Sequence, residues 1–86
     1  MYRYTIYTQY FDNLKGIVAE FFPKGFTIQK QIGYDHLGEC EESASIIVLI
    51  NSNKHILTET LCSAIKRINK QKTVLLTIEE IQGRFI

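Results

Sequence analysis

Polar and apolar positions alternate with a period of two in two short segments of this chain, two further short segments are mostly apolar, and apolar positions recur every three to four residues in two longer segments. Alternation is typical of a strand with one buried face, a short apolar run is consistent with a more buried strand, and the longer period is typical of an amphipathic helix. The predicted strands span residues 2–8, 26–34, 43–50 and 73–78, and the predicted helices span residues 11–22 and about 54–69. The predicted order is therefore strand, helix, strand, strand, helix, strand.

The second and third predicted strands differ in how many apolar faces they carry. In residues 26–34 one face is apolar and the other is polar, but Lys30 falls among the apolar positions. An inward lysine is tolerated at the edge of a sheet, where it reaches water and discourages pairing with another edge, so we expect an edge strand. In residues 43–50 both faces are apolar, because Ile47 and Leu49 alternate with other apolar residues. This pattern predicts a central strand with one apolar face left over.

Both predicted helices have identifiable ends. The first carries an apolar stripe from Phe11 to Phe22, has Asp12 in its first turn, and stops at Pro23-Lys24-Gly25. The second follows a cluster of helix-capping residues, Asn51-Ser52-Asn53. Its expected buried residues are Leu57, Leu61, Ala64, Ile65 and Ile68.

The segment after the last predicted strand carries a helix-start pattern and an apolar end. Thr77-x-x-Glu80 matches a capping box, which predicts a short helical turn that ends at Gly83. The following Arg84-Phe85-Ile86 is expected either to dock on its own domain or to add to the sheet of a neighbour.

This order of elements predicts an α+β domain with the ferredoxin-like βαββαβ arrangement, in which two helices cover one face of an antiparallel four-stranded sheet. Right-handed crossovers place the first and third strands in the middle and the second and fourth at the edges.

At 86 residues the chain has room for one core, so residues 1–86 are expected to form a single domain. The other face of the sheet is left bare, with Tyr7, Ile47 and Leu49 near its centre. Such a face suits a dimer or trimer contact, or the docking of another protein.

Composition and charge exclude more functions than they support. The chain is 45% hydrophobic and 22% charged, with a formal net charge of +1, which gives no long-range attraction to nucleic acid or to a membrane surface. The longest apolar run, residues 46–50, is far shorter than a membrane span, and the N-terminal segment does not match a signal peptide. Cys40 and Cys62 lack metal-ligand and redox spacing, so we expect reduced thiols in a cytoplasmic protein.

Four of the nine acidic residues cluster in the predicted hairpin connection between Tyr34 and Ser43. Together with a neighbouring histidine they form the candidate partner-binding set, which is Asp35, His36, Glu39, Glu41 and Glu42. Calcium requires more oxygen ligands in a fixed loop and zinc requires a tetrahedral ligand set, and the spacing fits neither, so we predict no metal and no cofactor. Two interpretations remain: a solvated acidic turn that keeps the hairpin soluble, and a surface that recognises another protein.

A second cluster is basic and lies at the end of the second predicted helix. Its members are Lys66, Arg67, Lys70 and Lys72. Cationic side chains favour the negative end of a helix dipole, so one interpretation is a solvated helix end. The alternative is a site for phosphate or another anion. Opposite charges at the hairpin and at this helix end also suit self-association of the chain as a homo-oligomer.

The aromatic residues and the histidines form no recognisable site for chemistry. Nine of the ten aromatic residues lie in the first 34 positions. Tyr2, Tyr4 and Tyr7 on a central strand resemble the aromatic residues of sheets that stack RNA bases, but the third predicted strand carries none and the RNP1 pattern is absent. The sequence has no nucleophile elbow and no phosphate-binding loop, and His36 and His55 have no motif partner. We therefore predict neither nucleic-acid binding nor enzymatic activity.

Residues 33–48 read G-Y-D-H-L-G-E-C-E-E-S-A-S-I-I-V, and the second predicted helix is followed by V-L-L-T-I. These segments resemble the small CutA and PII-like ferredoxin-fold proteins, which share a long hairpin with an aromatic residue, a glycine and a glutamate near its turn. The resemblance implies a trimer with clefts between subunits. The PII nucleotide-binding signatures are absent, so no ligand-binding residue is carried over. In size and lack of motifs the chain also resembles small phage and mobile-element proteins that bind a host protein.

These observations together predict a non-enzymatic protein-binding module, specifically a phage-type inhibitor of a bacterial defence or regulatory protein. The acidic hairpin and the bare sheet face are its expected contacts. The alternative is a PII-like oligomeric sensor that binds a small anionic ligand or nucleotide between subunits, near the basic cluster.

Overall fold

The computed structural model describes residues 1–34, 37–38 and 40–86. Three of the candidate partner-binding residues, Asp35, His36 and Glu39, lie outside the described residues. The chain forms β1 (Tyr2–Gln9), α1 (Leu14–Phe21), β2 (Thr27–Tyr34), β3 (Cys40–Ile50), α2 (His55–Ile68) and β4 (Leu75–Glu80). This is the order of elements that the sequence predicts. Within the described part of the chain, neither helix is long and apolar enough to cross a membrane.

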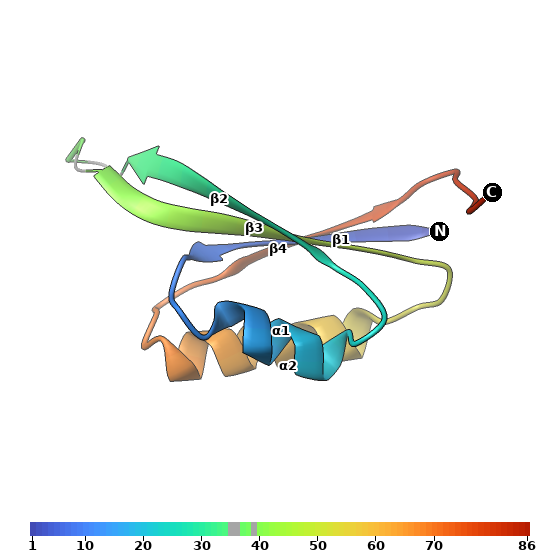
Figure 1. The fold of residues 1–86 in the computed structure, drawn as a ribbon, viewed down its shortest axis with the longest axis horizontal. Helices are drawn as coiled ribbons and strands as arrows, with labels where there is room; N and C mark the ends of the chain where they lie inside the picture. The colour runs from blue at the N-terminus through green and yellow to red at the C-terminus, as the bar shows by residue number, and fades with distance from the viewer. Residues whose placement is uncertain (35–36, 39) are drawn as a thin grey trace.

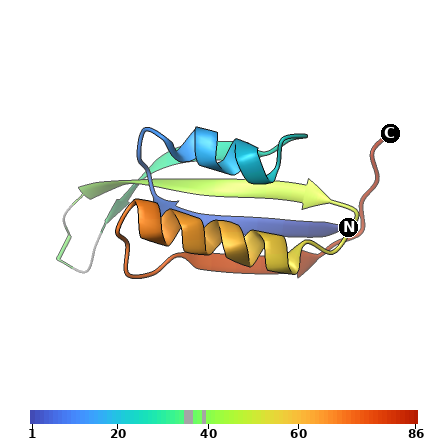
Figure 2. The same ribbon diagram turned by 90° about the horizontal axis from the view of Figure 1, so that it is seen from below.

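The strands form one antiparallel sheet in the order β2-β3-β1-β4. Both helices lie on one side of it, α1 on the side of β2 and β3 and α2 on the side of β1 and β4 (Figures 1 and 2). The predicted ferredoxin-like βαββαβ fold is confirmed, including which strands are central and which are at the edges. Lys30 lies on the edge strand β2 as predicted, and its Nζ is 4.1 Å from the centre of the Tyr10 ring.

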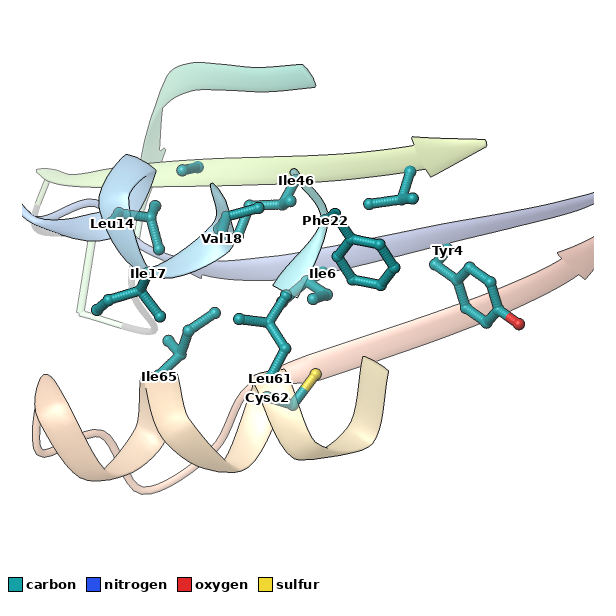
Figure 3. Packing of buried hydrophobic residues seen from close by; sticks show 12 residues of the cluster. Tyr4, Ile6, Leu14, Ile17, Val18, Phe22, Ile46, Leu61, Cys62 and Ile65 are labelled. Atoms are coloured by element: carbon teal, nitrogen blue, oxygen red, sulfur yellow. The ribbon is translucent and has the colours of Figure 1, made fainter. Parts of the chain in front are cut away.

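The core fills the space between the sheet and the helices. β1 and β3 supply it at every second position, because their register places Tyr4 opposite Val48 and Ile6 opposite Ile46. All four side chains are at most 2% exposed. The fully buried apolar helix residues that close the core are Leu14, Val18, Leu61 and Ile65 (Figure 3). Since burying a side chain of this size contributes roughly 1.5–3 kcal/mol, this cluster is what holds the two layers together.

The first helix begins later than predicted. α1 starts at Leu14, so Phe11 and Asp12 precede it, and the prediction that Asp12 lies in the first helical turn is wrong. The chain turns before the helix because the N–H of Leu14 donates to the carbonyl oxygen of Phe11 at 3.0 Å.

The start of α2 is stabilised by one of the predicted capping residues. Asn53 Oδ1 accepts a hydrogen bond from the N–H of His55, the first residue of the helix, at 2.9 Å.

The buried face of α2 is rotated relative to the predicted one. Three of the five predicted residues are buried, but Leu57 is half-buried and Ile68 is 48% exposed. Thr58 and Cys62 are buried in their place. Thr58 tolerates burial because its hydroxyl donates to the carbonyl oxygen of Lys54 at 2.7 Å, which a hydrophobic pattern cannot anticipate.

The predicted helical turn that begins at Thr77 is wrong. Thr77 to Glu80 belong instead to β4, and residues 81–86 after it contain no helix. The capping-box pattern is overridden by pairing with β1, in which Arg3 lies opposite Glu79. Pairing along a whole strand satisfies more backbone hydrogen-bonding groups than a single helical turn can.

Candidate functional site

The sheet has one side that no described helix covers, which we call the open face (Figure 1). Side chains alternate along each strand, and Tyr4 and Ile6 point to the helices, so the residues between them point to the open face. The central strands contribute Arg3, Thr5, Tyr7, Ser45, Ile47 and Leu49 to it. The edge strands contribute Thr27, Gln29, Gln31, Leu75, Thr77 and Glu79.

Large apolar side chains are exposed on the open face. Tyr7 is 42% exposed, Leu49 is 46% exposed and Leu75 is 59% exposed. Tyr7 lies directly opposite Leu75 on the neighbouring strand, so the two form a cross-strand pair. On its other side Tyr7 lies opposite Ser45, whose small side chain is buried. The bare apolar face that the pattern of β3 predicts is therefore present, and β4 adds Leu75 to it.

An ion pair lies at one end of the open face. Arg3 Nε and Nη2 donate to Oε1 and Oε2 of Glu79, both at 3.1 Å. These hydrogen bonds, with the charge of Arg3, lower the pKa of Glu79, and the same contacts raise the pKa of Arg3. Both side chains are nearly half exposed, at 42% and 49%, so the pair adds little to stability. It does hold two opposite charges at defined positions beside the apolar residues.

The two described acidic residues of the candidate partner-binding set lie on opposite faces of the sheet. β3 begins at Cys40, so Glu41 and Glu42 belong to the strand, and the predicted connection up to Ser43 is too long. They continue the hairpin because each pairs with a residue of β2. Alternation places Glu41 on the open face and Glu42 on the helix side. A flat partner on the open face can therefore contact Glu41 but not Glu42.

The candidate basic residues also fall into two groups. Lys66 and Arg67 lie in the last turn of α2, whereas Lys70 and Lys72 lie in the connection to β4. The second pair lines a hollow of about 510 Å³ that also includes Glu41. A carboxylate in the same hollow opposes the binding of an anion.

Gln71 anchors this connection to the sheet. Its Nε2 donates to Thr8 Oγ1 at 2.8 Å, and its Oε1 accepts from the N–H of Gln9 at 3.0 Å. Its own N–H donates to the carbonyl oxygen of Lys66 at 3.0 Å, which closes the end of α2. Lys70, just before it, has a φ of 52°, in the left-handed region that favours glycine. The neighbouring lysines are thus held on a tightly bonded turn.

A larger hollow of about 830 Å³ lies where α1 turns into β2. Apolar side chains from several elements line it, including Phe21, Phe22, Phe26, Leu49, Leu57 and Phe85. Phe85 is 71% exposed, so the apolar end of the chain borders this groove without being buried in it. The pattern of apolar residues along the chain did not predict this groove. Its signal was the group of phenylalanines on both sides of Pro23, which indicated only the end of a helix.

His55 and Cys62 are residue types that often act in catalysis, but their packing in this fold does not favour a catalytic role. His55 meets the rings of Tyr2 and Tyr4 edge-on, with centroids 5.2 and 5.6 Å apart. Its Nε2 is buried and has no hydrogen-bond partner among the described residues. Burial raises the pKa of the free Cys62 thiol to about 11, so the thiol stays protonated near neutral pH and is a poor nucleophile. Among the described residues, no group of three metal-ligating side chains could hold a metal ion.

Comparison with a solved structure supports the fold. A DUF3240 family protein from Shewanella baltica OS155 aligns over 99% of this chain and 94% of its own, with a TM-score of 0.63 and 11% identity. The de novo designed protein Foldit4 aligns over 94% of this chain and 96% of its own, with a TM-score of 0.45 and 14% identity. The first match shows a shared small α+β fold and nothing about function. No family model and no curated protein matches the sequence, so the CutA and PII-like resemblance stays a prediction.

Proposed function

We propose that this chain is a non-enzymatic module that binds another protein through its open face. The observation that carries the proposal is the exposure of Tyr7, Leu49 and Leu75 on a side of the sheet that no described helix covers. Soluble domains rarely gather large apolar side chains on one face unless that face meets a partner.

The residues around these side chains fit the edge of a protein interface. Such interfaces combine an apolar centre with a polar, solvated rim. The Arg3–Glu79 ion pair supplies charge at one end, and Gln29 and Gln31 supply amide groups along β2. Tyr7 is the kind of rigid, amphipathic side chain that often dominates binding energy. A flat protein surface with an apolar centre and hydrogen-bonding edges is the partner that suits this face.

More specifically, we propose that the partner is a bacterial defence or regulatory protein in the cytoplasm. The module would inhibit this partner by covering its active or binding surface. Its support is that a domain of 10.0 kDa with a flat apolar face is suited to occupying a surface. Glu41, which also points to the open face, would add a contact to a partner with basic residues there.

Affinity capture from the native host with the tagged chain, followed by mass spectrometry, tests the proposal. The wild-type chain is expected to retain a specific partner. The double variant Tyr7→Arg/Leu49→Arg is expected to lose it, because the complex would bury two unpaired charges. Ile56→Arg is the matched control, since Ile56 is 81% exposed on α2, away from the open face. Capture at the wild-type level by the double variant would contradict the proposal.

A second candidate function, a PII-like sensor of a small anion, rests on Lys70 and Lys72 in the hollow between the connection that precedes β4 and the strands β1 to β3. Placing a lysine at the positive φ of residue 70 is unfavourable, and strain of this kind often accompanies a functional site. A thermal-shift screen with nucleotides and inorganic phosphate tests this candidate, since ligand at about 100 times its Kd stabilises a fold by about 2.7 kcal/mol. Lys70→Ala/Lys72→Ala should abolish the shift and Lys66→Ala/Arg67→Ala should not. The absence of any shift with the wild-type chain at millimolar ligand would remove this candidate.

A further inference from the structure

We propose that two copies of this chain pair antiparallel through the outer edge of β4, which joins their four-stranded sheets into one continuous sheet. β4 is an edge strand, and within the described residues no element pairs with its outer side (Figure 2). This inference does not rest on the proposed binding function, because a chain that binds no other protein could still dimerise in this way.

The backbone of β4 presents free hydrogen-bonding groups at that edge. In an antiparallel pair, alternate residues direct their N–H and C=O groups toward one neighbour and the residues between them point the other way. The N–H of Ile81 donates to the carbonyl oxygen of Met1, so the odd-numbered residues of β4 point to β1. The backbone groups of Leu76 and Ile78 therefore point outward. An unpaired edge of this kind is a template for a further strand.

The two edges of the sheet differ in their protection against pairing. β2 carries Lys30 on its helix side, with Nζ over the Tyr10 ring, and such an inward charge discourages edge pairing. β4 contains no proline, its charged residues are confined to its end at Glu79 and Glu80, and its register with β1 runs without a bulge from Leu75 to Glu80. Leu75 and Ile78 are also 59% and 40% exposed. β4 is therefore the edge that is open to a partner strand.

The charges along β4 favour a second copy of the same chain as that partner. Lys70 and Lys72 precede the strand, and Glu79 and Glu80 end it. A segment with positive charges just before its strand and negative charges at the end of the strand is complementary to itself only in an antiparallel arrangement. Glu79 is already paired with Arg3, whereas Glu80 makes no ion pair with a described residue. The carboxylate of Glu80 is thus available to a second copy.

One register satisfies both the apolar and the charged positions. A two-fold axis through Leu76 places that residue against its own counterpart and places Val74 opposite Ile78 of the second copy. β4 begins at Leu75, and extending the same register into the connection before it brings Lys72, which lies at a bend, toward Glu80 of the second copy. Moving the axis one residue toward the C-terminus would set Val74 opposite Glu80, an apolar residue against a charge. The geometry therefore points to the register centred on Leu76.

This arrangement would also enlarge the open face. Because the axis is perpendicular to the sheet, both helix layers stay on one side and both open faces on the other. Leu75 of each copy then lies beside the joint, next to Thr77 of the second copy. The dimer presents the apolar surface twice on one continuous sheet, so a partner with two equivalent sites would gain from binding both.

Sedimentation equilibrium of the full chain tests the dimer and the edge that forms it. The wild-type chain is expected to reach twice its mass of 10.0 kDa. Ile78→Lys places an inward lysine on β4, as Lys30 is placed on β2, and is expected to leave a monomer. Ile32→Lys is the matched control, because it puts the same substitution on the outer edge of β2 at a residue that is 67% exposed. Circular dichroism checks that both variants fold.

A charge exchange tests the register separately. Lys72→Glu alone is expected to weaken the dimer about tenfold, because two attractive cross-strand pairs become repulsive. Lys72→Glu/Glu80→Lys is expected to restore the wild-type affinity. A wild-type monomer at high micromolar concentration, or a dimer that survives Ile78→Lys but not Ile32→Lys, would overturn the proposal. Failure of the double exchange to restore affinity would overturn the register.

Discussion

The hydroxyl of Tyr4 accepts a hydrogen bond from the backbone N–H of Lys54 at 2.7 Å, and this bond joins the central strand β1 to the start of α2. Tyr4 is fully buried, so water cannot replace the contact in the folded chain. Tyr4→Phe removes the acceptor and leaves a donor without its partner. We expect the free energy of unfolding to fall by about 1–3 kcal/mol, measured by urea unfolding.

Tyr7→Phe is the control for that measurement. The side chain of Tyr7 is 42% exposed, so losing its hydroxyl should change the free energy of unfolding by less than about 0.5 kcal/mol. If both variants lost the same free energy of unfolding, the hydrogen bond between Tyr4 and Lys54 would not account for the effect of Tyr4→Phe.

Lys70 follows the end of α2 at a positive φ of 52°, which costs an L-residue with a side chain about 1–2 kcal/mol. Lys70→Gly is therefore expected to raise the free energy of unfolding by about 1 kcal/mol, measured at a concentration at which the chain is monomeric. Lys70→Ala keeps the Cβ atom and should leave the value nearly unchanged. If glycine stabilises the chain no more than alanine does, the strain is not at this residue.

Arg3 holds the pKa of Glu79 below its ordinary value in the folded chain. A carboxyl group whose pKa is lowered by folding stabilises the fold above its unfolded pKa, and the contribution is lost as the pH falls through the folded pKa. We expect the free energy of unfolding to decrease as the pH is lowered from about 5, with part of the decrease missing in Glu79→Gln. The part that depends on Glu79 should be small and should shrink in about 1 M salt, because both side chains are exposed. Identical pH profiles for the wild-type chain and the variant would contradict this.

Burial raises the pKa of Cys62 to about 11, which leaves about a hundredfold less thiolate at neutral pH than an ordinary thiol has. In a Cys40→Ser variant, the remaining thiol is therefore expected to react with a disulfide reagent at least about a hundredfold more slowly when folded than when unfolded in urea. The measurement is the rate of release of the coloured thiol product. Similar rates in the two states would mean that Cys62 is accessible in the folded chain.

Local patterns were sufficient to predict the order of the elements and the position of β2. Lys30 among apolar residues indicated an edge strand, and Ile47 and Leu49 indicated a central strand with a second apolar face. Both inferences concern a side chain and its neighbours along the same strand. Such information is present in a short stretch of sequence, because burial of one face recurs at every second residue.

The candidate surface could be predicted only in part. Tyr7, Ile47 and Leu49 were anticipated, but Leu75 joins them because β4 pairs with β1 in a register that places it beside Tyr7. The acidic set was divided because β3 begins at Cys40. A one-residue difference in strand position sends neighbouring side chains to opposite faces, and strand limits depend on cross-strand partners.

By itself, the sequence determined which segments form strands and helices and which sides of them are apolar. These properties follow from the spacing of apolar residues within each segment. The tertiary structure alone decided which distant residues meet. Opposite Arg3, Glu79 became part of a strand although its local pattern predicts a helical turn. Gln71 was placed on Thr8 and Gln9 in the same way. The physical reason is that pairing with a distant strand contributes more free energy than a local capping pattern does, and no local window contains both partners.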